Sequence, residues 1–207
     1  MTDRTAPVTL AGTPLGDTRH ACAFFSGDEE EYGVLLPFVK DGFDRGDRAV
    51  HIVHPEQRDD HRRRLEAAGF DAAAAEERGR LELRSSTETY LRDGRFDVEQ
   101  QLAVFEEMAD SGRSRIVCRM DWAARGGVVV DDVIEFEARI NHLWCRHDHA
   151  VVCTYRQEQV GGDAMVDILR THPMVIVGGI LQRNPYFVPP EQFLPELRER
   201  RARQRLH

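Results

Sequence analysis

The chain lacks two features that would place it in common functional classes. It has no basic excess, because 28 Lys and Arg face 36 Asp and Glu in 207 residues, a formal net charge of −8. A nucleic-acid-binding surface must be basic to neutralise phosphates, so this balance argues against nucleic acid as a partner. No apolar run approaches the length of a membrane-spanning helix, and the first residues do not read as a signal peptide. We therefore expect a cytoplasmic protein without direct membrane contact.

Cysteine is also scarce. The four cysteines, Cys22, Cys118, Cys145 and Cys153, are widely spaced, and three of them stand in apolar, strand-like segments. In a reducing cytoplasm such residues are typical buried thiols rather than disulfide partners. The sequence identifies no cofactor.

The order of apolar patterns predicts an α/β fold. Residues 1–19 carry Pro, Gly, Thr and Asp without helical or strand periodicity, and we interpret them as a flexible lead-in. Strand-like and helix-like segments alternate over residues 20–189, which predicts one domain with a mostly parallel sheet flanked by helices on both faces. Residues 190–207 form an arginine-rich helix in this interpretation. Periodicity predicts strands at 20–26, 48–53, 81–85, 116–120, 149–155 and 174–181, and helices at 29–45, 55–68, 98–111, 131–146, 163–170 and 190–206.

The first strand leads into a glycine turn and a helix, the order found in phosphate-binding units. A phosphate loop needs several glycines, a lysine and a following Ser or Thr, whereas here only Gly27 is present and Asp28, Glu29, Glu30 and Glu31 follow it. We expect no ATP hydrolysis by the usual route. Carboxylates in a first helical turn also stabilise the helix, and this explains most of them. Glu30 is the one that we assign to a pocket, and Pro37 should kink the helix or delay its start.

Ligands on parallel sheets bind at the carboxyl ends of the strands. Candidate contacts at these ends are Phe25 and Ser26 at the end of the first strand, Asp121 at the end of "RIVCRMD" with Trp122 after it, and Tyr155 at the end of "VVCTY". Asp121 stands where a nucleotide-hydrolysing enzyme keeps its metal-binding aspartate, but a simple turn residue is the favoured explanation. Trp122, Tyr155 and Tyr90 are interpreted as pocket residues, and Phe24 and Phe96 as core.

Two residues precede prolines and are assigned to a pocket rim. His172 precedes Pro173 and Asn184 precedes Pro185, so each is biased towards extended backbone. The competing interpretation is two ordinary strand boundaries.

The segment "NHLWCRHDH" contains side chains that can bind metal. His142, Cys145, His147 and His149 lie within eight residues, and imidazole and thiolate are zinc, iron or copper ligands. Their spacing matches no standard finger, and a polar helix end explains them as well. We therefore predict no metal site and keep these four residues as weak candidates.

Several segments taken in order resemble one known family. His20, Phe25 and Glu30 are followed by "LPFVKDGFDRGDRAVHIV", "TETYLRDGRFD", "RMDW", "FEARINHLW", "VVCTY", "ILRTHPMVIVGG" and "NPYF". Over residues 20 to 187 this pattern is similar to the MEDS family, a methanogen/methylotroph sensory domain named from the sensory part of a dichloromethane-responsive repressor. The resemblance implies a RecA-like fold with a degenerate phosphate loop and a sensory module for small organic ligands. It raises His172 among the candidate contacts and adds His20 to them.

The sequence leaves three main functions open, and a fourth, weaker one is a metal or redox sensor that uses the cluster around Cys145. The leading hypothesis is a non-catalytic sensory domain that binds a small organic ligand at the strand ends and signals to a regulatory partner, such as a kinase or transcription regulator. The second is a protein that binds a nucleotide without hydrolysing it. The third is an interaction protein without a ligand, acting through its C-terminal helix. A homodimer is compatible with each of them.

Overall fold

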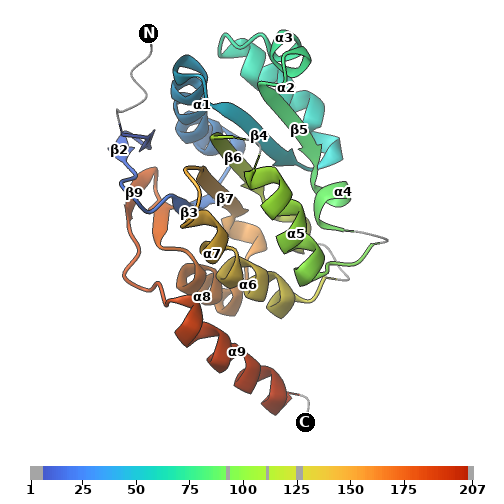
Figure 1. Cartoon of the computed structure of the whole chain (residues 1–207), viewed down its shortest axis with the longest axis vertical. Helices are drawn as coiled ribbons and strands as arrows, with labels where there is room; N and C mark the ends of the chain where they lie inside the picture. The colour runs from blue at the N-terminus through green and yellow to red at the C-terminus, as the bar shows by residue number, and fades with distance from the viewer. Residues whose placement is uncertain (1–6, 92–93, 111, 125–127, 205–207) are drawn as a thin grey trace.

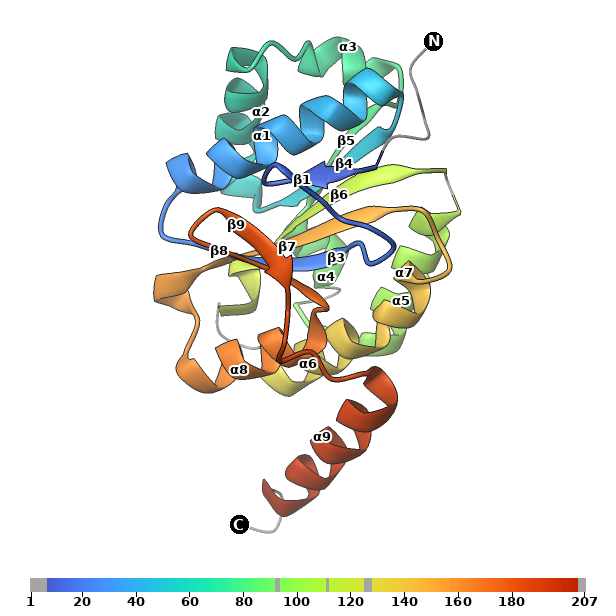
Figure 2. The same ribbon diagram turned by 90° about the vertical axis from the view of Figure 1, so that its left-hand side faces the viewer.

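A seven-stranded sheet separates two layers of helices (Figures 1 and 2). The computed structural model describes residues 7–91, 94–110, 112–124 and 128–204. The strand order is β5-β4-β6-β7-β3-β8-β9, and every neighbouring pair is parallel except β8 with β9. The strands are β3 (His20–Phe25), β4 (Arg48–Val53), β5 (Leu81–Ser85), β6 (Ser114–Arg119), β7 (Ala150–Arg156), β8 (Met174–Val177) and β9 (Ile180–Arg183). The predicted α/β fold with a mostly parallel sheet is confirmed.

One face of the sheet is covered by the first three helices, which lie above the sheet in Figure 2. They are α1 (Asp28–Arg45), α2 (Arg58–Ala67), which follows a short 3-10 turn η1 (Pro55–Gln57), and α3 (Ala72–Glu77). Helix α1 runs through Pro37 and begins at Asp28, so the proline does not delay its start. The helix ends at Gly46, whose left-handed backbone (φ 87°) suits glycine at a helix C-terminus.

The other face is covered by the later helices. They are α4 (Ser86–Tyr90), α5 (Val98–Ala109), α6 (Val130–Arg139), α7 (Asn141–Trp144) and α8 (Gly162–Thr171), with 3-10 turns η2 (Asp121–Ala124) and η3 (Gln157–Gln159). Helix α9 (Pro190–Gln204) starts against α6 and α8 and projects from the body in both views. No helix in the described part of the chain has the length and apolarity to cross a membrane.

Strand side chains alternate between the two layers, as the pleat requires. In β3, Cys22 and Phe24 belong to the core under α4–α9, whereas Ala21, Ala23 and Phe25 belong to the core under α1–α3. All six residues of β3 are buried, which explains its continuous apolar run. Residues paired in register on neighbouring strands therefore point to the same face of the sheet.

Three sequence predictions are corrected, and two helices were missed. Residues 7–19 are not a featureless lead-in, because β1 (Thr9–Leu10) and β2 (Thr13–Pro14) pair there and Leu10 is 1% exposed. The predicted strand 174–181 is the hairpin β8–β9, which turns at Gly178 and Gly179 with φ of 56° and 73°. The predicted helix 131–146 is divided between α6 and α7, and α3 and α4 were not predicted. Residues 1–6 and 205–207 of the predicted terminal segments lie outside the described residues.

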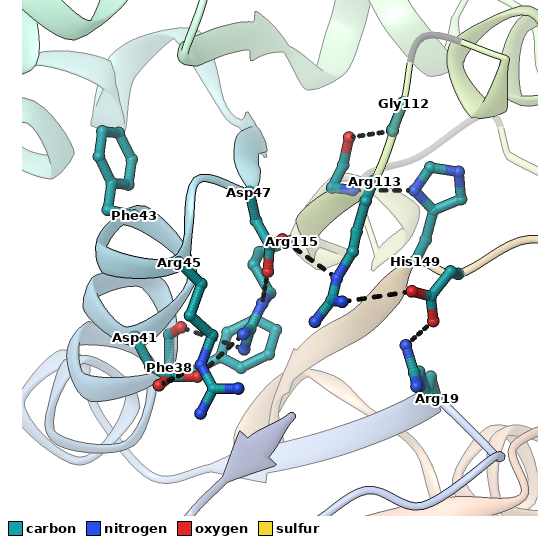
Figure 3. Close-up of polar contacts among 12 residues, drawn as sticks. Arg19, Phe38, Asp41, Phe43, Arg45, Asp47, Gly112, Arg113, Arg115 and His149 are labelled. Carbon is teal, nitrogen blue, oxygen red and sulfur yellow. Dashed lines mark hydrogen bonds and ion pairs between the residues drawn. The ribbon is translucent and has the colours of Figure 1, made fainter. Parts of the chain in front are cut away.

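An alternating row of arginines and aspartates joins the amino ends of the central strands to α1 (Figure 3). Arg115 Nε donates to Asp47 Oδ2 at 2.8 Å, and its Nη2 donates to Asp41 Oδ2 at 2.9 Å. Arg113 connects Asp47 to Asp148. Arg115 and Asp47 are 1% and 2% exposed, so this pair is part of the interior, and the bond from Arg115 to Asp41 holds α1 against the sheet.

Candidate functional site

The loop between β3 and α1 satisfies its own polar groups. The backbone N–H and the hydroxyl of Ser26 both donate to Glu30 Oε2, at 2.8 and 2.7 Å. The backbone hydrogen bond from Ser26, and then the one from its hydroxyl, lower the pKa of Glu30. The two predicted ligand contacts are therefore engaged with each other, and Glu30 caps the loop instead of facing a pocket.

The carboxylates that follow Gly27 neutralise arginines at the ends of neighbouring strands. Arg119 Nη2, at the end of β6, lies 3.1 Å from both Asp28 Oδ1 and Glu31 Oε2. Arg156, at the end of β7, also pairs with Asp28, and its Nη2 is 3.5 Å from Glu31 Oε2. Burial raises the pKa of Glu31, while the Arg119 charge and a 2.9 Å hydrogen bond from the Thr154 hydroxyl lower it. The arginines that could hold a phosphate at this edge are thus occupied by the chain's own carboxylates.

A cavity of about 150 Å³ lies beside these ion pairs, between α6, α8 and the ends of β6 and β7. Its walls are mostly apolar and include Met120, Val133, Ile134, Ala164 and Ile168. Two of the predicted contacts, Asp121 and Tyr155, also line it.

Asp121 is the carboxylate among the polar side chains that line this cavity, which also include Tyr155, Arg156 and Gln159. The residue is 8% exposed, and its Oδ1 has no hydrogen-bond partner among the described residues. A buried carboxylate oxygen without a donor costs free energy, so the position favours a ligand or water that donates to it.

Tyr155 connects the cavity to the interior. Its ring stacks on Phe24 at 5.6 Å between centroids, and its hydroxyl donates to Glu137 Oε1 at 3.4 Å. Burial, followed by the charge of Glu137, raises the pKa of Tyr155 well above its usual value. The phenol therefore stays protonated and acts as a donor.

Three other predicted contacts are core residues. Tyr90 stacks on Trp122 with centroids 4.4 Å apart, and both are 1% exposed. Phe25 is also 1% exposed and packs in the core on the opposite side of the sheet. None of the three lines the cavity described above. Sequence spacing placed them near strand ends but could not show that neighbouring aromatic rings fill the space.

His20, His172 and Asn184 lie at the amino ends of the strands, opposite the cavity. His20 begins β3, His172 precedes β8 and Asn184 follows β9. The Asn184 amide donates to the carbonyl of His172 at 2.7 Å, a structural role. His20 and Asn184 line a second, open cavity of about 470 Å³. The predicted contacts therefore divide between two edges of the sheet.

Two of these residues join a buried polar cluster that sequence reasoning missed. Glu137 Oε2 lies 3.6 Å from His20 Nε2 and 3.4 Å from His172 Nε2. Cys153 Sγ lies 3.6 Å from His20 Nε2 and 3.9 Å from Glu137 Oε2. Within the part of the chain that the structure describes, these four residues form the group of His, Cys and carboxylate side chains that could hold a metal ion. The sequence feature that could have indicated this cluster is Glu137, a carboxylate on the apolar face of α6, three residues after Ile134.

The weak metal candidates around Cys145 do not converge. His142 is exposed and lies near Glu191 on α9, and the exposed Cys145 thiol donates to the His142 carbonyl. Both ring nitrogens of His149 are engaged, one by the Ser114 N–H at 3.1 Å and the other by the Ala109 carbonyl at 3.0 Å. All four cysteines are free thiols, and Cys22, Cys118 and Cys153 are buried as predicted.

Comparisons with known proteins agree with this architecture. Residues 19–173 match the family model described as MEDS, the methanogen/methylotroph, DcmR sensory domain. No curated protein matches the chain. Among solved structures, the flagellar accessory protein FlaH from Methanocaldococcus jannaschii is similar, with a TM-score of 0.53 and 10% sequence identity over 79% of this chain and 76% of that chain. At this identity the likeness shows a shared RecA-like fold alone.

Proposed function

This chain belongs to the MEDS family of sensory domains, and we propose that it is a non-catalytic cytoplasmic sensor that binds a small organic molecule between α6 and α8. The observation that carries the proposal is the small, mostly apolar cavity lined by Asp121, a residue whose buried Oδ1 has no hydrogen-bond partner in the described part of the chain. An engineered apolar cavity of roughly this volume, about 150 Å³, is large enough for benzene. The ligand class that fits is a molecule of a few carbons with one hydrogen-bond donor.

The ion pairs at the β3–α1 loop support a phosphate loop that has lost its function. Arg119 and Arg156 face Asp28 and Glu31, and a triphosphate would have to displace these carboxylates or bind beside them. Like charges at such short range repel, so nucleotide binding without hydrolysis is the weaker of the two ligand hypotheses. The Asp121 Oδ1 atom, which has no partner among the described residues, likewise favours a hydrogen-bond donor over an anion.

The helices that line the cavity also offer a path to a partner. Arg200 on α9 lies 3.1 Å from Asp131 Oδ1 on α6 and 2.7 Å from Asp167 Oδ2 on α8. A ligand that changes the distance between α6 and α8 would therefore move the two carboxylates that hold Arg200, and α9 with them. We assign the output to this helix, which a kinase or transcription regulator would read, since a ligand can signal only through states that it binds differently.

Binding of three isosteric probes tests the ligand class: propylamine, 1-propanol and 1-chloropropane. Methyl chemical shifts of Val133, Ile134 and Ile168 report occupancy of the cavity. The amine and the alcohol should bind more tightly than the chloride, because only they donate to Asp121. The variant D121N should reduce the preference for the amine by about tenfold, roughly 1.4 kcal/mol.

Matched variants on α8 separate the cavity from the surface. Ala164→Phe places a ring in the cavity and should abolish the shifts, whereas Val166→Phe, at a residue that is 55% exposed on the same helix, should preserve them. Hydrogen exchange of α9 should slow when propylamine is added. The variant R200Q should remove this response, and R198Q, at an exposed position of α9, should retain it.

Other outcomes would overturn the proposal. If Ala164→Phe binds the three probes as tightly as the wild type does, the cavity is not the binding site. Hydrolysis of ATP with Mg²⁺ that is lost in D121N would refute the non-catalytic assignment. Tight binding of ATP or ADP without hydrolysis would favour the nucleotide-binding alternative. If the chain binds a regulatory protein and no small molecule alters that binding, the third hypothesis, an interaction protein without a ligand, would be favoured.

A further inference from the structure

The buried cluster behind β3 and β7 draws its four side chains from four parts of the fold. His20 opens β3, Cys153 lies within β7, Glu137 projects from α6, and His172 stands between α8 and β8. Their exposures are between 0% and 4%, and their ligand atoms all lie within 4.8 Å of one another. Such a set of polar groups in a core needs a compensating partner.

Hydrogen bonds orient both imidazoles towards the centre of the cluster. The Asn141 amide nitrogen donates to the Thr171 carbonyl at 2.8 Å and the Glu137 carbonyl at 2.9 Å, which turns its oxygen towards His20 Nδ1 at 3.0 Å. His20 Nδ1 is therefore the donor, and its Nε2 carries a lone pair. His172 Nδ1 lies 2.8 Å from the carbonyl of Ile168, so the same tautomer follows, and its Nε2 lacks a hydrogen-bond partner among the described residues.

Four of the six separations between the ligand atoms are near the edges of a tetrahedron around a metal ion, and the other two are within 4.8 Å. Zinc binds nitrogen and oxygen at about 2.0–2.1 Å and sulfur at about 2.3 Å, which gives tetrahedral edges of about 3.3 to 3.6 Å. The distances around the cluster are 3.4 Å for His172–Glu137, 3.6 Å for His20–Glu137, 3.6 Å for His20–Cys153 and 3.9 Å for Cys153–Glu137. Small movements of side chains would complete the coordination.

We propose that His20, Glu137, Cys153 and His172 form a closed zinc site in the core of the domain. A thiolate and a carboxylate balance the two charges of the ion, and two neutral imidazoles complete the ligand set. The Asn141 oxygen and the Ile168 carbonyl are the outer partners that hold the two histidines, as is usual for imidazoles that bind metal. Four protein ligands leave no open position, so the ion acts by holding the fold and not by activating water.

The site has a route for metal entry and a connection to the cavity between α6 and α8. His20 lines the open cavity at the amino ends of the strands, which provides a path for the ion. Tyr155 lines the cavity between α6 and α8, and its hydroxyl contacts the second oxygen of Glu137. By binding Glu137, the ion would therefore fix the position of α6, and Tyr155 alone would separate it from the cavity. The zinc site does not depend on the ligand proposed above.

The metal content of the intact protein tests the site directly. Protein purified without chelator and after zinc supplementation should hold one zinc per chain. X-ray absorption at the zinc edge should show one sulfur at about 2.3 Å and three nitrogen or oxygen atoms at about 2.0–2.1 Å. Cobalt(II) in place of zinc should give visible bands of tetrahedral intensity and a thiolate charge-transfer band. A folded wild-type protein that binds neither ion would overturn the proposal.

A matched pair of cysteine variants identifies the sulfur ligand. Cys22 and Cys153 are register partners on neighbouring strands and belong to the same buried core. C153S should lose the charge-transfer band and weaken zinc binding by at least about tenfold, the effect expected from removing a ligand or its support. C22S should keep both. If C22S loses the band as C153S does, or if C153S keeps it, the assignment is wrong. If C153S does not fold, C22S alone still tests the assignment, because loss of the charge-transfer band in C22S would refute it.

Discussion

Gly33 and Gly42 lie in the same helix, α1, and replacing each of them with alanine should change stability in opposite directions. A Cβ atom at Gly33 would meet no other group within 4 Å. A Cβ atom at Gly42 would lie 2.5 Å from Arg115 Cγ and 3.0 Å from its Nε. One substitution therefore adds a methyl group to open space, and the other forces it into a buried side chain.

Arg115 has little freedom to move aside. Its guanidinium is held by Asp47 at 2.8 Å and Asp41 at 2.9 Å, and it lies 4.9 Å from the centre of the Phe38 ring (Figure 3). The residue is 1% exposed. Shifting Cγ by the distance needed for van der Waals contact would pull the guanidinium away from these carboxylates.

The expected magnitudes follow from the two environments. Alanine is better than glycine within a helix by about 0.5–1 kcal/mol, so G33A should raise the free energy of unfolding by that amount. G42A has the same gain, but overpacking costs about 1–3 kcal/mol and disrupting a buried ion pair about 3–5 kcal/mol. We expect G42A to be destabilised by at least about 1 kcal/mol. For a chain of this size, 1 kcal/mol is about 2–4 °C in Tm.

Urea denaturation at constant pH measures both effects, provided that the m-values agree. The control is a second pair of variants that carries R115A, in which the Cγ atom is absent. In that background G42A should no longer be destabilising. Stabilisation by both glycine substitutions in the wild-type background would show that Arg115 adapts freely and would refute the reasoning.

Two further predictions concern buried charges. Burial lowers the pKa of His51 to about 4, while the unfolded chain takes up its proton near 6.5, so the unfolded state binds more protons between these values. The free energy of unfolding should therefore fall as pH drops through this window, by about 2 kcal/mol at pH 5 relative to pH 8. Urea titrations at several pH values should show that the free energy of unfolding depends less on pH in H51Q than in the wild type. An equal pH dependence in the two proteins would contradict this. R119M should cost about 3–5 kcal/mol because it leaves the charge of Glu31, which is 2% exposed, without its closer arginine. The double variant E31Q/R119M should recover part of that loss, and a loss below about 1 kcal/mol in R119M would show that Arg156 suffices.

Local patterns predicted the strands and helices well where burial is continuous. The runs around Cys22, Val50 and Val152 are apolar on both faces because each strand lies inside the sheet. The hairpin at Gly178 was missed because two short strands separated by glycines have the same composition as one long strand. The ordered residues 8–15 were missed because their few apolar side chains have no local periodicity and are buried by α1 instead.

The candidate site was predicted only in part. Asp121 and Tyr155, which line the cavity, were predicted because they stand at or just beyond the ends of strands, and parallel strands end at the same edge. Tyr90 and Trp122 satisfy nearly the same criterion, but they stack on each other in the core. Whether a residue at a strand end lines a cavity depends on which neighbours fill the space, and those neighbours are distant in the chain.

The sequence by itself determined the α/β alternation, the acidic β3–α1 loop without a lysine and the family to which the chain belongs, because each of these is written in consecutive residues. Only the tertiary structure decided that Asp28 and Glu31 pair with Arg119 and Arg156, and that His20 meets Cys153, 133 residues away. Strand order and register bring these groups together, and neither is encoded in any short segment. Local propensity determines where helices and strands form. The packing of the whole core determines which of their side chains meet, and the cluster of His20, Glu137, Cys153 and His172 therefore arises from packing.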